Sequence, residues 1–405
     1  MNLRSFSCDF NAAALWAGLT AFVWYAFGAV PLHIAVSEQL GLSTAQTSSW
    51  IFIVWFSGAV STIAMSFYFR QPIPITWTIP GLIYLGTLAD RFSFSELVGA
   101  NLVAGLLLLV PGFLGVGGRI MRWLPLPIIM GMFGGSILTY VIRMVAATVE
   151  DFAVAGVTVG GYLLGRLIRS PRVPPVGLAV IGGGIAVAFI GTTEAKLVEW
   201  TLPVLAIPEM SFSLSSIIAV SLPMVVLAMG LGNVQGIGFL LAQGYTISVN
   251  SVSTVVGINS VVNALLGGHP ATVARTGAAI LASPDSGDIS GRYWAAVISA
   301  ALTIVLAFAA TPVASLLNVL PKTYIFALAG LAILSSLQDA LEKSFGGKMR
   351  FGALVGFVVA ATPFAVLGIT SAFWAILAGF GASLLAERQE LLAHWREKGP
   401  NDRSR

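Results

Sequence analysis

The feature that most constrains this chain is that its apolar residues run almost from one end to the other. Uncharged runs of roughly twenty residues recur along it, and each can cross a ~30 Å hydrocarbon core as a helix. Charged residues account for only 9% of the 405 positions, whereas a soluble domain carries about a quarter. So little charge cannot cover the surface of a soluble protein of this size. We therefore predict an all-α, polytopic protein embedded in a lipid bilayer.

Charged residues, Pro/Gly clusters and polar stretches divide the chain into about fourteen apolar segments. These segments lie at 11–32, 46–69, 73–88, 95–116, 122–146, 152–168, 174–191, 213–231, 250–267, 271–283, 291–316, 321–338, 350–367 and 370–386. The first seven form one half of the chain, 1–210, and the next seven form a second half, 211–386. A polar tail, 387–405, follows. Two segments, 73–88 and 271–283, are too short to span as simple helices.

The basic residues indicate how the segments are oriented. If each segment crosses once from a cytoplasmic N-terminus, nearly all Lys and Arg fall on the cytoplasmic side, with Arg91, Lys196 and Lys322 opposite. A missing or extra span would destroy this bias, so both termini and the tail are predicted to be cytoplasmic. The net charge of +4 then reflects orientation in the membrane and not nucleic-acid binding. The first run has no obvious cleavage site and is interpreted as a retained helix.

The two short segments share the pattern P-x-T-x-x-x-x-G, at 74–81 and at 270–277. Paired short segments interrupted by Pro and Gly, about half a chain apart, are typical of transporters built from inverted repeats. Because seven spans is an odd number, the second half must run in the opposite sense through the membrane. The alternative is that these Pro/Gly clusters are loops between ordinary helices.

Each short segment is predicted to be an extended strand that leads into a half-helix. The prolines prevent a continuous helix, and the residues between them tolerate β structure. Pro80 fits the first turn of a helix, and Thr78 and Thr276 are predicted as N-caps. Irregular backbone at membrane depth is tolerated where it lines a cavity, and helix N-termini attract anions. We therefore expect an anionic substrate where the two segments meet.

Three polar residues near this point are candidates for substrate binding. Arg275 would add a full positive charge, since a charged residue at this depth usually faces a cavity with a partner; it could also pair with a carbonyl or lie nearer the interface. Asn233 and Gln235 could bind a polar ligand or join helices to one another. Arg143 is expected at the membrane interface and not at a ligand.

The titratable residues near the predicted pathway are few. His33, expected at the outer end of the first span, and His269 are candidate proton carriers, because histidine titrates between pH 5 and 8; both could instead be structural. Glu38 and Asp339 are the remaining titratable candidates. The histidines form no cluster with acidic residues at metal-ligand spacing, so neither a metal site nor an enzyme is predicted. The single cysteine, Cys8, excludes an intrachain disulfide.

Three stretches resemble one known family: PITWTIPG at 74–81, NVQGIG at 233–238 and GGHPATVARTGAAI at 267–280. They are similar to the benzoate/proton symporter family (BenE), whose wider relatives are nucleobase–cation symporters of the uracil-transporter type and sulfate/bicarbonate anion transporters. The resemblance extends over essentially the whole chain. It implies a seven-plus-seven inverted repeat with a core domain from spans 1–4 and 8–11 and a gate domain from spans 5–7 and 12–14.

The resemblance also implies a site between the third and tenth spans, with contributions from the first and eighth. The predicted substrate-binding residues are Tyr25, Thr76, Trp77, Thr78, Ile79, Pro80, Gly81, Asn233, Gln235, Ala274, Arg275, Thr276, Gly277 and Ala278. In the mechanism we expect, the anionic end of the substrate binds beside Thr78, Arg275 and Thr276. Trp77 and the first-span aromatic residues Trp24, Tyr25 and Phe27 then offer stacking surface for a ring.

Nucleobase symporters place acidic residues in the eighth and tenth spans, and the corresponding stretches here contain none. The expected function is therefore proton-coupled import of benzoate or a similar aromatic monocarboxylate by alternating access, in a bacterial inner membrane, with the proton as coupling ion and no cofactor. A homodimer is expected from the resemblance alone. The alternatives are a transporter of another organic anion or of a nucleobase-like solute, and a passive channel.

Overall fold

The computed structural model describes residues 10–116, 123, 125–168, 174–190 and 200–396. Cys8, Lys196 and the end of the tail lie outside these ranges. Six described helices are long and apolar enough to cross a bilayer. A seventh span results if two helical segments, Tyr293–Ala307 and Ala310–Asn318, which meet at a bend of 61°, are counted as one. The six are α2 (Ala12–Gln39), α3 (Thr44–Phe69), α5 (Phe94–Phe113), α7 (Leu126–Glu150), the helix over Leu214–Ala242, and α17 (Lys322–Phe345). The chain is thus a mostly helical membrane protein, as predicted.

The other elements are shorter. Apolar helices of intermediate length are η1 with α8 (Phe152–Gly156, Val157–Ile168), α9 (Pro175–Ile190), α13 (Val249–Leu265), α18 (Arg350–Ala361) and α19 (Ser371–Ala386). The bent pair is α15 (Tyr293–Ala307) with α16 and η5 (Ala310–Ser315, Leu316–Asn318). The remaining elements are β1 (Ile75–Trp77), α4 (Ile79–Gly86), β2 (Ala271–Val273), α14 (Arg275–Leu281), η4 (Pro284–Ser286), β3 (Ala365–Val366), β4 (Ile369–Thr370) and α20 (Arg388–Arg396).

The helix over 214–242 is not uniform. Widened π-helical turns, η2 (Ile217–Ser221) and η3 (Leu227–Asn233), alternate with α10 (Leu214–Ser216), α11 (Leu222–Val226) and α12 (Val234–Ala242). Such widened turns often mark functional positions within membrane helices. η3 contacts β2, α4 and α7, so this irregular stretch lies where several elements meet.

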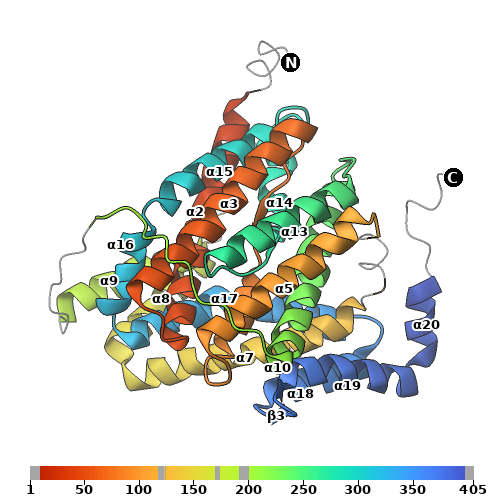
Figure 1. The fold of residues 1–405 in the computed structure, drawn as a ribbon. Helices are drawn as coiled ribbons and strands as arrows, with labels where there is room; N and C mark the ends of the chain where they lie inside the picture. Colours follow the sequence, from red (N-terminus) through yellow and green to blue (C-terminus); the bar gives the residue numbers. More distant parts are fainter. Residues whose placement is uncertain (1–9, 117–122, 124, 169–173, 191–199, 397–405) are drawn as a thin grey trace.

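The helices pack in two groups that are visible in Figure 1. In the first group, α5 packs on α13, α3 packs on α13 and α15, and α2 packs on α15. In the second, α7 packs on α17, α18 and α19, and α8 packs on α9 and α17. Contacts of α2 with α17 and α9, and of α4 and η3 with α7, join the two groups.

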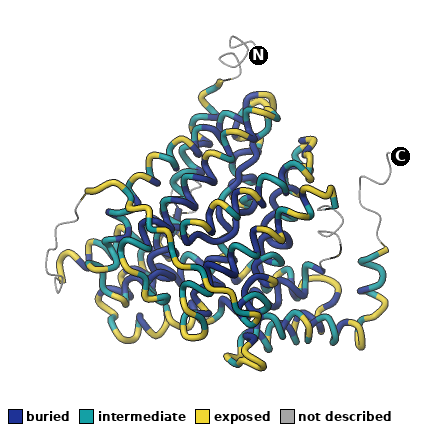
Figure 2. The backbone as a smooth tube through the Cα atoms, viewed as in Figure 1, coloured by how far each residue is buried: buried dark blue, intermediate teal, exposed yellow. Residues whose placement is uncertain are grey.

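The surface of the bundle is strongly apolar. Buried residues lie along the middle of the bundle, while exposed residues lie mainly around its outside and in loops (Figure 2). Large apolar side chains stand almost fully exposed on the second group, including Val149, Phe189 and Leu385, at 81%, 86% and 89%. A water-soluble surface does not present such side chains in this number, so these faces contact lipid.

The first helix differs from the prediction. It was expected to end near residue 32, with His33 at its outer end, but α2 continues through Pro31 to Gln39 and His33 is fully buried. A proline within a membrane helix is tolerated because neighbouring groups satisfy the freed backbone. His33 therefore lies in the interior and not at the interface.

Candidate substrate site

The two short segments cross as an antiparallel strand pair. β1 and β2 align Ile75 with Val273, Thr76 with Thr272, and Trp77 with Ala271. Two further backbone hydrogen bonds of 2.9 Å extend the ladder, from Thr78 N to Pro270 O and from Ala274 N to Pro74 O. The P-x-T portions of the shared pattern therefore face one another, with threonines opposite each other and a proline at each end. This observation confirms the predicted strand and half-helix form of both segments.

Side chains satisfy the outer edges of this isolated strand pair. Thr62 Oγ1 donates to Ile75 O at 2.8 Å and accepts from Ile75 N at 2.9 Å, and Ser260 Oγ accepts from Ala271 N at 2.9 Å. Asn233 Oδ1 accepts from Val273 N at 2.9 Å and from Thr272 Oγ1 at 3.1 Å. Unsatisfied backbone groups at membrane depth are costly, so these side chains keep the strands in place.

The two half-helices begin differently. Thr78 is the N-cap of α4, as predicted, because its hydroxyl accepts from Gly81 N at 3.3 Å, and Pro80 lies in the first turn. The prediction that Thr276 caps α14 is wrong. β2 ends at Val273 and α14 begins at Arg275, so the cap position falls on Ala274, which has no side-chain acceptor. Arg275 is therefore the first residue of α14 and does not precede it.

A cavity of about 260 Å³ lies beside the crossing, and we call it the central cavity. Aromatic and apolar side chains from both groups of helices dominate its walls, as expected for a small-molecule site. The first group contributes Trp24, Tyr25, Gly28, Ala29, Leu32, Thr76, Trp77, Ile79, Pro80, Leu231, Gly232, Gln235, Thr272, Val273, Ala274, Arg275 and Thr276. The second group contributes Met130, Phe133, Tyr162, Arg166, Pro175, Val176, Leu331, Ala332, Ser335, Ser336 and Asp339.

Many of the residues predicted for substrate binding line the central cavity, but others do not. Lining residues among them are Tyr25, Thr76, Trp77, Ile79, Pro80, Gln235, Ala274, Arg275 and Thr276. Thr78, Gly81, Asn233, Gly277 and Ala278 are not among the residues that line it. Their observed contacts are structural: Thr78 caps α4, Asn233 holds β2, and Gly277 packs so closely on Tyr25 that a Cβ would lie 1.7 Å from its hydroxyl oxygen.

Arg275 has a carboxylate partner on the opposite wall. Its Nη1 donates to Asp339 Oδ2 at 2.8 Å and to Gln235 Oε1 at 3.1 Å. Lys343 Nζ donates to the same two groups, at 3.0 Å to Asp339 and 2.7 Å to Gln235. The network therefore joins α14 and α12 to α17. With two cations and one carboxylate, it carries a surplus positive charge.

From the sequence, Asp339 was predicted only as a titratable residue near the pathway, and its pairing with Arg275 was not predicted. A signal was nevertheless present, because Ser335, Ser336, Asp339 and Lys343 recur at spacings of three or four within the apolar α17. Residues at these spacings share a face of a helix. A polar stripe on a membrane helix points to a cavity or to another protein group. Arg166 in α8, which also lines the central cavity, was likewise missed.

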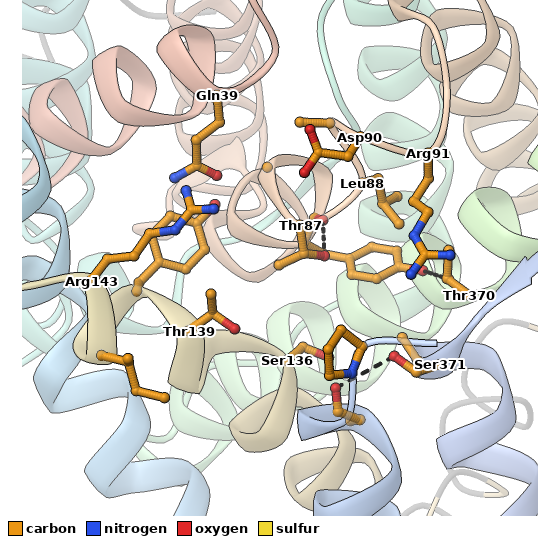
Figure 3. Close-up of a pocket in the computed structure, with 18 of the residues that line it drawn as sticks. Gln39, Thr87, Leu88, Asp90, Arg91, Ser136, Thr139, Arg143, Thr370 and Ser371 are labelled. Atoms are coloured by element: carbon orange, nitrogen blue, oxygen red, sulfur yellow. Dashed lines mark hydrogen bonds between the residues drawn. The ribbon is translucent and has the colours of Figure 1, made fainter. Parts of the chain in front are cut away.

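A larger cavity of about 640 Å³ lies at the other end of α4 (Figure 3). Gln39, Thr87, Asp90 and Arg91 line it on one side, and Ser136, Arg143 and Thr370 line it on the other. Tyr84, which also lines it, hydrogen-bonds through Oη to Thr370 Oγ1 at 3.1 Å. Although it is the larger of the two, it does not reach the strand crossing, because no residue of β1, β2 or α14 is in its described lining. Arg143, expected at the interface, lines this cavity with its guanidinium 5.6 Å from the Phe326 ring centroid.

The two candidate histidines lie behind the wall of the central cavity. Both are fully buried, with ring centroids 5.9 Å apart. His33 lies 5.4 Å from Trp77, whose ring separates it from the cavity lined by Trp77. Among the described residues, no group of three or more His, Cys, Asp or Glu side chains could hold a metal ion.

Comparison with known proteins places the chain in a family. The family model described as "Benzoate membrane transport protein" (BenE) matches residues 8–385. The chain is 28% identical over 343 residues to the inner membrane protein YdcO of Escherichia coli K12, with 84% of this chain and 87% of YdcO covered. It is 25% identical over 382 residues to a benzoate membrane transport protein of Acinetobacter baylyi, with 93% and 96% covered.

Solved structures agree on the fold. The transmembrane domain of the cyanobacterial bicarbonate transporter BicA aligns with a TM-score of 0.58 at 17% identity, covering 95% of this chain and 97% of that domain. Murine Solute Carrier 26 family member A9, an anion transporter in the inward-facing state, aligns with a TM-score of 0.62 at 13% identity, covering 94% of this chain and 69% of the other. At such identities the likeness shows the fold alone.

The family match extends over nearly the whole chain, and the family model and the Acinetobacter baylyi relative are described as membrane transport proteins and not as enzymes. The strand crossing, the central cavity and the apolar exterior are those of a membrane transporter. The chain belongs to the BenE family of benzoate membrane transport proteins.

Proposed function

We propose that this protein imports benzoate, or a closely similar aromatic monocarboxylate, together with a proton by alternating access. The observation that carries this proposal is the composition of the central cavity. Its lining combines several aromatic side chains with the guanidinium group of Arg275. An aromatic carboxylate has these same two parts, a flat apolar ring and one delocalised negative charge.

The charges around the central cavity favour one added anion. Arg166, Arg275 and Asp339 are the charged residues in its described lining, and Lys343 shares Asp339 with Arg275. A carboxylate that reaches Arg275 would neutralise the surplus positive charge of this network. Arginine suits this role because its guanidinium can bind a carboxylate through two parallel hydrogen bonds. Asp339 then acts as the internal competitor that holds Arg275 when no substrate is bound.

The aromatic residues favour a ring as the other part of the substrate. Trp24, Tyr25 and Trp77 from the first group face the same cavity as Phe133 from α7. Aromatic rings prefer offset-stacked or edge-to-face contacts, worth about 0.5–1.5 kcal/mol beyond their buried area. A volume of about 260 Å³ lies near the ~300 Å³ lower end of small-molecule pockets, which excludes bulky substrates.

The two groups of helices supply the moving parts that we propose. The first group corresponds to a core domain, from spans 1–4 and 8–11, and the second to a gate domain, from spans 5–7 and 12–14. With the five shorter apolar helices and the two broken segments crossing as well, the chain forms fourteen spans in a seven-plus-seven inverted repeat, 1–210 and 211–386. Arg275 and Asp339 lie on opposite sides of this division. Breaking their ion pair therefore accompanies movement of one domain against the other.

The basic residues of the sequence support a cytoplasmic location for both termini and the 387–405 tail in a bacterial inner membrane. In this orientation the larger cavity at the outer end of α4 is the periplasmic vestibule, and Asp339 and Lys343 lie toward the cytoplasm. The protein needs no cofactor in this scheme, and the proton is the coupling ion. A homodimer in the bilayer is part of the proposal by family resemblance only.

Uptake of labelled benzoate into proteoliposomes, with an imposed inward proton gradient, tests the function. Because benzoic acid crosses lipid unaided, initial rates are compared with those of protein-free liposomes at the same pH. We expect saturable uptake above that baseline, faster with the gradient, and inhibited by excess unlabelled benzoate but not by uracil. Absence of uptake above the baseline would overturn the substrate, and uptake indifferent to the gradient would overturn only the coupling. Linear, non-saturable uptake would instead indicate a channel.

A further inference from the structure

His33 and His269 form a buried pair that the substrate site does not use directly. His33 lies on α2, and His269 lies in the turn between α13 and β2. Both side chains are fully buried, and their ring centroids are 5.9 Å apart. The rings of Trp50, Trp55 and Trp77 surround His33 at centroid distances of 5.9, 5.7 and 5.4 Å. The pair therefore lies inside an aromatic shell between the two broken segments and α3.

One nitrogen of each imidazole has a partner that determines the tautomer of the neutral ring. His33 Nδ1 lies 3.0 Å from the carbonyl oxygen of Ala29, which can only accept, so Nδ1 carries the hydrogen. Trp50 Nε1 donates to His269 Nδ1 at 2.9 Å, so this nitrogen is the acceptor and Nε2 carries the hydrogen. The same type of residue thus has opposite tautomers at the two positions.

The Nε2 atoms of the two rings have complementary hydrogen-bonding roles. His33 Nε2 is an acceptor and His269 Nε2 is a donor, and both are buried without a hydrogen bond to a described protein group. The backbone carbonyl of Thr78 also faces the His269 ring. A buried polar atom without a partner is costly and marks a position of functional interest. No direct hydrogen bond joins the two rings, whose centroids are 5.9 Å apart, so a water molecule between them is the bridge that could accept from His269 Nε2 and donate to His33 Nε2.

Two further unpaired hydroxyl groups lie on the helices between the histidine pair and a solvent-exposed turn. Ser37 lies one helical turn beyond His33 on α2, and Thr47 lies in the first turn of α3. Both hydroxyl groups are buried and without a partner in the described chain. They lie along the two helices on the way to the α2–α3 turn, where Gly41 and Ser43 are exposed. This arrangement provides hydroxyl groups that can pass a proton inward.

The other side of the pair is the wall of the central cavity. Trp77 contacts His33 and lines the cavity, and Ala29, whose carbonyl holds His33, also lines it. A change in the charge of His33 is therefore felt one residue away from the substrate. Three tryptophan rings lie within the ~6 Å range at which an aromatic face attracts a cation, and each meets the His33 ring at a steep interplanar angle of 67–86°.

We propose that His33 and His269 form a single buried proton-binding site, loaded through Ser37 and Thr47 and coupled to the central cavity through Trp77. The proposal rests on the proton-coupled transport proposed above. The incoming proton adds to the lone pair of His33 Nε2, which becomes an imidazolium, and no other bond breaks. After protonation, Nε2 of His33 and Nε2 of His269 both carry a hydrogen, so neither can accept a hydrogen bond from the other. Because Nδ1 of His269 accepts from Trp50, the His269 ring cannot move its hydrogen to Nδ1 and so cannot turn its Nε2 into an acceptor.

Charged groups on neighbouring elements do not provide an alternative partner. Among the described residues, neither imidazole has an Asp, Glu, Lys or Arg hydrogen-bond partner, and each histidine is the other's titratable neighbour. Glu38, further along α2, pairs with Lys322 of α17 at 2.6 Å. Asp339, which lines the central cavity, pairs with Arg275 and Lys343. The two imidazoles therefore share no ion pair with the residues of the anion site.

Asparagine variants separate titration from structure. Asn places its amide near the position of Nδ1, so His33→Asn can still donate to Ala29 and His269→Asn can still accept from Trp50, while Nε2 is lost. His394→Asn in α20 is the matched control, since it removes the third and last histidine away from the pair. Benzoate is added to each purified protein in weakly buffered detergent, and its binding and the accompanying proton uptake are measured.

We expect the wild-type protein and His394→Asn to take up about one proton per benzoate, with affinity falling about tenfold per pH unit above the titration point of the pair. His33→Asn and His269→Asn should bind benzoate without proton uptake and with an affinity independent of pH. Proton uptake that survives in either variant would overturn the proposal, as would wild-type binding of benzoate without a proton.

Nitrogen NMR of histidine-labelled protein tests the same site without benzoate. We expect a neutral Nδ1–H tautomer at His33 and a neutral Nε2–H tautomer at His269, each assigned from the variant that lacks it. The opposite tautomer at either position would overturn the proposal. If no protein binds benzoate, the proposed substrate fails, and the tautomers together with their titration then decide the histidine site alone.

Discussion

Arg275, the first residue of α14, donates a 2.8 Å hydrogen bond to Asp339 of α17, and this ion pair joins the two groups of helices at the edge of the central cavity. Both side chains are partly exposed, at 41% and 25%, so the pair can open without leaving a charge buried. An arginine held by an internal carboxylate can exchange that partner for the carboxylate of a substrate. Substrate binding as proposed depends on this exchange of partners at Arg275.

Asp339→Asn tests whether Asp339 competes with the substrate. The amide keeps the shape of the side chain but removes its charge, so Arg275 becomes free to bind an external carboxylate. We expect benzoate to bind roughly tenfold more tightly, which corresponds to about 1.4 kcal/mol. Equilibrium binding to purified protein checks this. Weaker binding would show that Asp339 supports the substrate and does not compete with it. Glu342→Gln, three residues along the same helix, is the control.

Gly277→Ala tests the packing behind the central cavity. The added Cβ would lie 1.7 Å from Tyr25 Oη, so the tyrosine, which lines the central cavity, must shift. We expect weaker benzoate binding, partly restored in the double variant with Tyr25→Phe, which lacks the clashing oxygen. Gly238→Ala in α12, where a Cβ meets nothing within 4 Å, should bind as the wild type does. Failure of Tyr25→Phe to improve Gly277→Ala would contradict the clash.

Asn233→Leu tests whether Asn233 holds β2. The substitution leaves Val273 N–H buried without its acceptor, which costs about 1–3 kcal/mol. We expect a clear fall in thermal stability in detergent. Asn101→Leu is a matched control, because Asn101 is equally buried but its Oδ1 has no partner. Equal stability of the two variants would mean that the hydrogen bonds of Asn233 do not stabilise the crossing.

Glu387, between α19 and α20, should make stability depend on pH. Partial burial raises its pKa, but hydrogen bonds from the N–H groups of Gly352 and Phe351 and from Ser383 outweigh this and lower it overall. A lowered pKa in the folded protein stabilises at neutral pH, and this contribution is lost as pH falls below the ordinary value of about 4.3 and through the folded value.

The measurement compares thermal unfolding of the wild type and Glu387→Gln. The wild type should be the more stable at pH 7, and the difference should shrink toward zero as the pH is lowered below 4. Glu390→Gln is the control variant, because the Glu390 carboxylate also accepts a hydrogen bond from a backbone N–H group, that of Met349. A difference that stays constant over this range would exclude the carboxylate charge as its source.

The sequence predicts the broken segments well because the responsible constraints are local. Prolines prevent a helix at 72–74 and at 270, and a threonine before Ile79-Pro80 begins the next helix. These rules depend on neighbours in the chain, and the structure follows them. The N-cap prediction for Thr276 is wrong because the end of β2 is set by its pairing with β1, and α14 begins at Arg275, two residues earlier than a cap at Thr276 requires.

Long-range partners could not be predicted in this way. Nothing near Arg275 in the chain indicates that Asp339, 64 positions away, is its partner, because that contact depends on how α14 faces α17. The position of His33 was wrong for a related reason. Pro31 is a strong local signal to end a helix, but packing on neighbouring helices carries α2 two turns further and buries the histidine.

The most direct test of the account is saturable benzoate uptake by proteoliposomes that contain either the wild-type protein or Arg275→Gln. Arg388→Gln in α20, away from both cavities, is the control for loss of an arginine. Hydrogen bonds to charged groups contribute about 1.5–3 kcal/mol, so we predict that Arg275→Gln takes up benzoate at least tenfold more slowly at low concentration. Arg388→Gln should match the wild type. Uptake by Arg275→Gln equal to that of the wild type would contradict the assignment of the anion site.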